Sequence, residues 1–205
     1  MAESSPREPS AGGLSRRGFL TTVGAAAGVL TLATVGATVG PLSHLSPLAT
    51  RRATSGPQNL PVNKSGRAAR VEETAVDPAY KLVVGGLSLS LFELQSLPQH
   101  TEVLPITCVE GWSAVGRWTG VRLRDLLDRA GVGQDRWVRV ESLEQAGIYR
   151  TSEVSPTYAR DPLTLLALRL GGEPLALDHG YPGRLIAPNR PGVLQTKWVH
   201  RIVTL

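Results

Sequence analysis

The sequence predicts an α+β domain with a mostly β core and short helices, from about residue 79 to residue 205. Two observations favour this class. Several apolar segments in this region have the length of single strands and are bounded by turn residues. The segments with helical spacing are short and irregularly placed, which is atypical of a parallel sheet with alternating helices. No Gly-x-Gly-x-x-Gly or Walker-type phosphate loop is present.

The predicted strands are of three kinds. Residues 81–86 are an apolar run that ends in a Gly-Gly turn, and residues 103–109 are an apolar run of strand length. Residues 137–142 alternate between apolar and polar side chains, as in a half-buried strand. A short strand is expected at residues 184–187 and a final strand at residues 198–205.

Two segments have helical spacing. A short helix is expected from Ser90, with leucines on one face and Pro98 as its end. A second is expected over residues 122–130, where four apolar residues recur at helical intervals and Gly131 follows. Residues 163–170 are apolar throughout, so their spacing leaves helix and strand both open.

The first 78 residues differ in composition from the rest. Residues 15–20, Ser-Arg-Arg-Gly-Phe-Leu, open an uncharged stretch and resemble a twin-arginine export signal. We therefore expect residues 1–50 to direct export to the periplasm or the outer face of the cytoplasmic membrane. Residues 18–42 are long enough to stay as a membrane anchor, and cleavage is the open alternative. Residues 51–78, rich in Gly, Pro, Ser and Asn, are expected to form a linker.

The charge of the chain carries little functional information. The net charge is +5, but much of the excess lies before residue 71. The domain has no run of Lys and Arg interleaved with aromatic residues, so we do not expect nucleic acid as a partner.

Cys108 is the one cysteine of the chain, and it lies near the end of the predicted strand 103–109. A cysteine in the loop after a strand is positioned to face a cleft, and its thiolate suits a soft, redox-active metal. A metal with one protein ligand takes its other ligands from elsewhere, typically from a cofactor. The alternative interpretation is a small buried apolar side chain.

A second group of candidate residues lies near the C-terminus. His179 and Arg184 occur in Asp-His-Gly-Tyr-Pro-Gly-Arg, and Lys197 follows shortly after, before Trp198. If these three cationic or donor-rich side chains converge, they would bind a phosphate and a polar heterocycle.

Taken together, these motifs resemble the molybdopterin-binding domain of the sulfite oxidase family. The resemblance covers residues 78–205, and its landmarks occur in the same order: Tyr80-Lys-Leu-x-Val-x-Gly, the Cys108 loop, Trp118-x-Gly-Val-x-Leu-x-Asp-Leu-Leu, Gly172-Glu-Pro-Leu, the His179 motif and Lys197-Trp. The resemblance implies a mononuclear molybdenum–molybdopterin cofactor, with Cys108 as catalytic residue and protein ligand to the metal. The residues that it implies for pterin and phosphate binding are Asn63, Ser142, His179, Arg184, Gln195, Thr196 and Lys197.

One departure from the family bears on the substrate. Sulfite oxidases have an arginine five residues after the cysteine, where this chain has Ser113. The loop resembles instead that of the periplasmic methionine sulfoxide reductase catalytic subunits. We therefore expect oxygen-atom transfer on a small or protein-bound sulfoxide-like oxide. A membrane b-type cytochrome or another electron carrier is the expected partner. Sulfite-type oxidation by the same cofactor is the alternative.

A different class of enzyme shares one motif. Residues 104–108, Leu-Pro-Ile-Thr-Cys, resemble the cysteine strand of sortase transpeptidases, and Arg117 lies about where their arginine occurs. A thiol nucleophile also needs a base or cationic partner, but His100 is too close in sequence and His44 lies in the export segment. A non-catalytic exported binding domain is a further alternative.

Overall fold

A computed structural model of the chain describes residues 56–205. The export or anchor segment expected over residues 1–50 lies outside the described residues. Within residues 56–205, no helix has both the length and the apolar character needed to cross a membrane.

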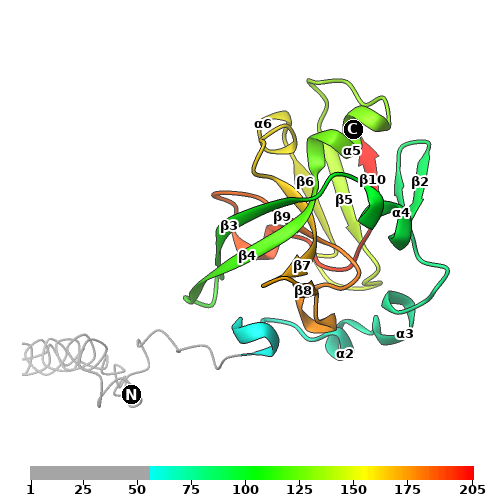
Figure 1. Ribbon diagram of the computed structural model, residues 1–205. Helices are drawn as coiled ribbons and strands as arrows, with labels where there is room; N and C mark the ends of the chain where they lie inside the picture. Colours follow the sequence, from blue (N-terminus) through cyan, green and yellow to red (C-terminus); the bar gives the residue numbers. More distant parts are fainter. Residues whose placement is uncertain (1–55) are drawn as a thin grey trace, which may run out of the picture. The chain divides into compact units, whose positions relative to one another are not determined.

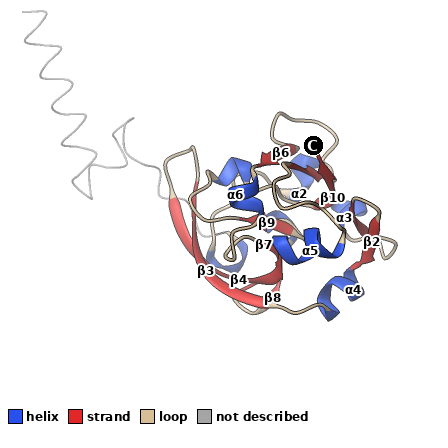
Figure 2. Ribbon diagram, turned by 90° about the horizontal axis from the view of Figure 1, so that it is seen from above, coloured by secondary structure: helices blue, strands red, loops and turns tan. Residues whose placement is uncertain are grey.

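Residues 56–205 contain two five-stranded sheets (Figure 1). The first sheet has the order β2 (Leu87–Ser90), β1 (Lys81–Val84), β10 (Val199–Thr204), β5 (Val138–Ser142) and β6 (Thr151–Val154). The second has β3 (His100–Thr107), β4 (Ser113–Arg122), β7 (Leu165–Leu170) and β8 (Glu173–Pro174), with β9 (Arg184–Ile186) also paired to β7. Strands β1 and β10 are parallel, and the other pairs are antiparallel. Seen from above, β3 and β4 curve around one side of the domain (Figure 2).

Short helices connect these strands, as the sequence predicts. Helix α4 (Leu91–Ser96) begins with a capping box between Ser90 and Glu93, and α5 (Leu123–Arg129) buries its leucines. The remaining helical turns are α2 (Gly66–Ala69), α3 (Glu72–Ala75), α6 (Pro156–Ala159) and the 3-10 turns η2 (Pro57–Asn59), η3 (Leu177–His179) and η4 (Gly192–Leu194).

The ambiguous segment 163–170 contains β7, which is buried on both faces. Leu166 and Leu168 pack with α5 and the first sheet. Leu165 and Ala167 point the other way and pack with residues of β3 and β4. Because both faces are covered, the strand carries no polar alternation, which explains why its sequence also suits a helix. This strand joins the two larger of the three apolar clusters in residues 56–205.

The structure differs from the expected linker over residues 57–75. This segment forms η2, α2 and α3 and runs along one edge of the domain (Figure 1). Val71 and Ala75 are buried and pack in one cluster with Trp198. The content of Gly, Pro, Asn and Ser indicated a linker. A few widely spaced apolar residues, such as Val71 and Ala75, are enough to hold the segment against the domain.

This packing leads to a stability prediction. Val71→Ala should lower the free energy of unfolding by about 1–3 kcal/mol, because it leaves a cavity in the cluster with Trp198. Val76→Ala, five residues later and 58% exposed, is the matched control and should change it by less than about 0.5 kcal/mol. Chemical denaturation measures both. Equal values for the two variants would mean that the segment is not part of the fold.

Candidate functional site

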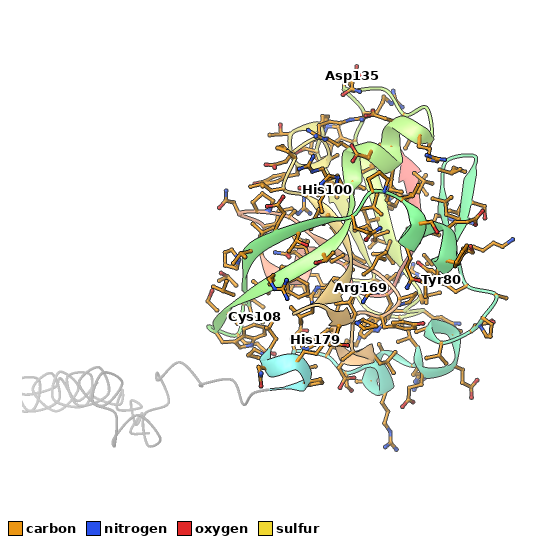
Figure 3. All side chains as sticks on the ribbon, in the orientation of Figure 1. Tyr80, His100, Cys108, Asp135, Arg169 and His179 are labelled. Atoms are coloured by element: carbon orange, nitrogen blue, oxygen red, sulfur yellow. The ribbon has the colours of Figure 1, made fainter. Side chains whose placement is uncertain are left out.

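Cys108 is held in the turn of the β3–β4 hairpin. Its backbone N–H donates to the carbonyl of Trp112 at 2.8 Å, and the N–H of Gly111 donates to the carbonyl of Cys108 at 3.1 Å. Gly111 has a φ of 89°, which favours glycine at this position. The side chain of Cys108 is buried, and Figure 3 shows it on the same side of the domain as His179. The hairpin therefore fixes the thiol at the end of a long paired strand.

The turn between η3 and β9 brings three cationic or donor side chains together. Gly180 has a φ of 111°, and a Cβ there would lie 3.1 Å from the Cβ atoms of both Arg184 and Lys197. A glycine is thus needed for the close approach of these two residues. His179, immediately before the glycine, is 1% exposed, and its Nε2 donates to the carbonyl of Pro57 at 2.5 Å.

Arg184 is buried with incomplete hydrogen bonding. Its Nη1 donates to the carbonyl of His179 at 3.4 Å, and its guanidinium lies 5.6 Å from the ring centre of Trp118. Its Nε has no hydrogen-bond partner among residues 56–205. Burial lowers the pKa of Arg184 to about 10, and the nearby Cys108 acts in the opposite direction. The guanidinium is therefore a buried cation with donor capacity to spare.

Lys197 is the second buried cation. Its Nζ donates to the carbonyl of Asp178 at 2.9 Å and to the carbonyl of Lys64. Burial, followed by the charge of Arg184, lowers the pKa of Lys197 to about 7. Burial also lowers the pKa of His179, and the charges of Arg184 and Lys197 act in the same direction. The pKa values of Arg184, Lys197 and His179 are thus all lowered in this site. A bound anion would raise each of them.

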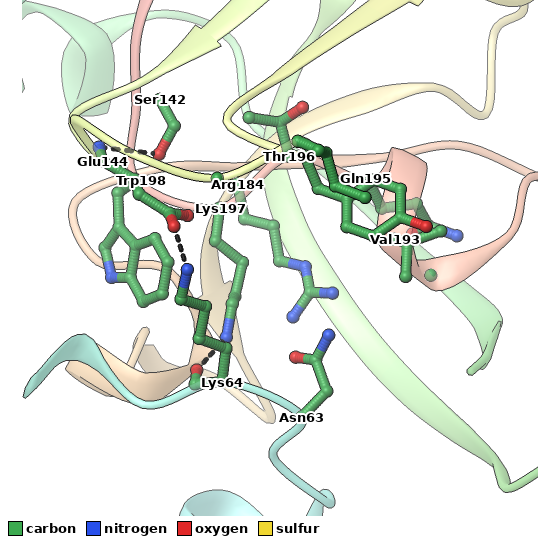
Figure 4. Close-up of a pocket in the computed structure, with 14 residues that line it drawn as sticks. Asn63, Lys64, Ser142, Glu144, Arg184, Val193, Gln195, Thr196, Lys197 and Trp198 are labelled. Atoms are coloured by element: carbon green, nitrogen blue, oxygen red, sulfur yellow. Dashed lines mark hydrogen bonds and ion pairs between the residues drawn. The ribbon is translucent and has the colours of Figure 1, made fainter. Parts of the chain in front are cut away.

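These residues line two adjoining cavities. The larger has a volume of about 200 Å³ (Figure 4). The predicted residues that line it are Asn63, Ser142, Arg184, Gln195, Thr196 and Lys197. The smaller cavity, of about 10 Å³, lies beside Cys108 and His179 and shares Asn63, Arg184 and Lys197 with the larger one. All eight residues predicted from the sequence thus meet at two adjoining cavities, while their roles there stay predictions.

Three of the predicted polar residues are held in place by hydrogen bonds. The amide of Gln195 donates to the carbonyl of Arg190 at 2.9 Å, and its Oε1 has no partner. The hydroxyls of Thr196 and Ser152 lie 2.7 Å apart. Ser142 Oγ accepts from the N–H of Glu144 at 3.1 Å. The buried and unpaired Oε1 of Gln195 is available to a donor in the larger cavity.

The structure adds two residues that the sequence reasoning missed. Glu144 is 7% exposed, lines the larger cavity and forms an ion pair with Lys64 (Figure 4). Lys64 follows Asn63 directly, so the sequence could have predicted both residues at the same cavity. Glu144 lies in the irregular loop after β5, where no spacing rule indicates that a carboxylate faces inward.

The donor set fits a phosphate-bearing heterocycle. Arg184, Lys197 and Lys64 are cations on the cavity walls, and the guanidinium Nε of Arg184 is unpartnered. Cationic side chains of this kind bind phosphate through charge-assisted hydrogen bonds. Glu144 and Gln195 Oε1 supply acceptors, which match the amino and N–H edge of a pterin.

Comparison with known proteins identifies the family. Residues 69–205 match the family described as the oxidoreductase molybdopterin binding domain. The chain belongs to this family. The resemblance inferred from the Cys108 and His179 motifs is thereby confirmed, and the sortase alternative is excluded. Consistent with this, Arg117 lines neither cavity, and its guanidinium donates to the carbonyl of Gly171.

Similar proteins include both reductases and oxidases. The chain is 34% identical over 137 residues to a subunit provisionally named as part of a protein-methionine-sulfoxide reductase in Azospira oryzae, covering 64% of this chain and 51% of that protein. It is 35% identical over 128 residues to the protein-methionine-sulfoxide reductase catalytic subunit of Xanthomonas axonopodis pv. citri, covering 56% and 40%. It is 30% identical over 160 residues to mitochondrial sulfite oxidase of Mus musculus, covering 62% and 29%. The chain spans about half or less of the length of these relatives.

A solved structure supports the fold. The sulfane dehydrogenase SoxCD of Paracoccus pantotrophus superposes with a TM-score of 0.57 at 24% sequence identity, covering 63% of this chain and 40% of that chain. The likeness confirms the expected mostly β fold of the sulfite oxidase type.

The low pKa of Lys197 leads to a pH prediction. Its folded-state pKa of about 7 lies below the usual lysine value of 10.5, so the unfolded chain binds more protons between these two values. Lys197 should therefore make the free energy of unfolding rise with pH in this window, by at most about 1.4 kcal/mol per pH unit. Denaturation from pH 6 to about pH 10 measures this slope.

The variant Lys197→Met should be more stable than the wild type near pH 7 and should lose this part of the slope. Lys81→Met, which removes an exposed lysine of β1, is the control for the loss of one charge. A Lys197→Met slope equal to that of the wild type would contradict the assignment of a buried, weakly basic amine.

Proposed function

We propose that the chain binds a mononuclear molybdenum–molybdopterin cofactor and removes an oxygen atom from a sulfoxide. The observation that carries the proposal is the meeting of the Cys108 thiol with the buried cations Arg184 and Lys197 at adjoining cavities. The net reaction would be a sulfoxide plus two electrons and two protons giving a sulfide and water. The bound metal would supply the two-electron redox chemistry.

Each side chain has a distinct task in this proposal. Cys108 presents its thiolate to the metal from a rigid hairpin. Arg184 and Lys197 bind the phosphate, and its negative charge offsets the cost of their burial. His179 orients the pterin, and Glu144 accepts hydrogen bonds from its amino edge. Apolar side chains of Ile106 and Trp112 beside the smaller cavity exclude water from the thiol.

With Arg184 and Lys197 assigned to the phosphate, the turn at Cys108 itself favours a neutral substrate over an anionic one. Glu110 and Trp112 lie in the same turn, where the indole N–H donates to the carboxylate at 3.3 Å. Ser113 is exposed, and its hydroxyl lies 3.0 Å from that of Thr107. A small anion such as sulfite needs fixed positive charge to offset its desolvation. An acid, an indole and a hydroxyl suit the neutral S=O group better.

The partners and location belong to the same proposal. Electrons would come from a separate carrier, such as a membrane b-type cytochrome. The twin-arginine resemblance of residues 15–20 supports export to the periplasm or the outer face of the cytoplasmic membrane, where residues 18–42 would serve as an anchor if retained.

The role of Cys108 is tested by Cys108→Ala. We expect activity to fall by about a hundredfold or more, since metal ligands contribute more than the groups that orient them. Pterin content should stay close to that of the wild type, because other residues hold it. Val109→Ala, at a 68% exposed position in the same turn, is the control. Parental activity in Cys108→Ala would remove the thiol from the metal site.

The substrate is tested by steady-state kinetics with artificial electron carriers. We expect kcat/KM for methionine sulfoxide reduction to exceed that for sulfite oxidation by about tenfold or more, because the turn at Cys108 lacks a cation to offset the charge of sulfite. The reverse order would favour the sulfite-type alternative.

A further inference from the structure

The site is closed on one side by an N-terminal strap, which we define as residues 56–66. The backbone of the strap is held by residues of the candidate site. The carbonyl of Pro57 accepts from His179 at 2.5 Å, and the carbonyl of Lys64 accepts from Lys197. The N–H of Gly66 donates to the Asp178 carboxylate at 2.8 Å. The strap is therefore bound to His179 and Lys197, which we assign to cofactor binding, and to Asp178 of the His179 motif.

The strap is fastened mainly by polar contacts. Within residues 56–65, Leu60 is the one buried side chain. Gln58 acts as a clamp: its amide donates to the carbonyls of Leu170 and Pro174 at 3.1 and 3.0 Å, and its Oε1 accepts from the N–H of Ala176 at 2.8 Å. Contacts of this kind each contribute about 1 kcal/mol in water, and Leu60 is the one strap side chain in the apolar cluster of β3, β4 and β7.

The space beside Cys108 is small. The cavity there has a volume of about 10 Å³, close to the minimum for one water molecule. Its lining includes the strap residues 60–63 and Ile106, which lies in the edge strand β3 and is paired with β4. A metal with its cofactor ligands is far larger than one water. A wall must therefore move for the thiol to reach a metal. Of the lining outside the strands, residues 60–63 of the strap form the longest continuous stretch, and the backbone of Trp112 is tied to Cys108 by a hydrogen bond.

We propose that the strap is the movable wall of the site: it opens to admit the pterin cofactor and closes over it. This inference rests on the proposed function. His179 and Lys197 then bind both the strap backbone and the cofactor, which couples closure of the strap to occupancy of the site. Glu144 also holds the strap in the closed position, because its ion pair with Lys64 joins the strap to the loop after β5.

The first test is hydrogen exchange on the full chain, purified from cells that make pterin cofactors and from cells that cannot. In the strap, the N–H groups of Leu60 and Gly66 are hydrogen-bonded. Their exchange should slow by about tenfold or more when the cofactor is bound. Amides of α5, outside the site, are the reference and should change little. Equal exchange of the strap in both preparations would overturn the proposal.

The second test loosens the strap without touching the site. Gln58 has a φ of 55°, which asparagine tolerates, so Gln58→Asn removes the clamp with little backbone strain. Gln99→Asn is the matched control, because Gln99 likewise donates to two backbone carbonyls, those of Leu94 and Leu97, away from the cavities. Pterin release after dilution, followed by fluorescence, should be about tenfold faster in Gln58→Asn and unchanged in Gln99→Asn.

The outcomes separate the two proposals. If the wild type holds pterin but Gln58→Asn releases it at the wild-type rate, the strap is not the movable wall, while the proposed function stands. A wild-type chain that never holds pterin would contradict the proposed function, and the strap proposal with it.

Discussion

The burial of two cations side by side is the constraint on which this site depends. Arg184 and Lys197 are less than 10% exposed, and no carboxylate within residues 56–205 forms an ion pair with either. Charged groups removed from water without partners are costly, and the lowered pKa values of both residues reflect that cost. A bound phosphate would offset it. The site is thus organised around an anion that the protein itself does not provide.

The fold supplies this arrangement from elements far apart in the sequence. The β3–β4 hairpin fixes Cys108, and the turn at Gly180 brings Arg184 close to Lys197. The segment before β1 lines the smaller cavity beside these residues. The two sheets meet through β7, so these elements are held by one continuous core. Strand β9 and the ends of β3 and β10 position Arg184, the thiol and Lys197, while a segment outside the sheets forms a further wall. This division suits a protein that must admit a large cofactor and then retain it.

Sequence reasoning predicted which residues meet at the two cavities better than it predicted their surroundings. The Cys108 loop and the His179 motif have distinctive residue types, and the structure brings them together. Strand β4 was not predicted, because Gly116 and Gly120 interrupt its apolar pattern; a Cβ on Gly120 would lie 2.0 Å from the Leu166 carbonyl oxygen. These glycines permit close packing, which depends on tertiary neighbours. The packed segment 57–75 and the inward-facing Glu144 were missed for the same reason, since neither has a periodic pattern.

The central claim is that this convergence of a thiol and two buried cations holds a molybdenum–pterin cofactor. It is tested most directly by the molybdenum and pterin content of the full chain, purified from cells that synthesise pterin cofactors. The account predicts about one molybdenum and about one pterin per folded chain. A folded chain that contains neither would contradict it.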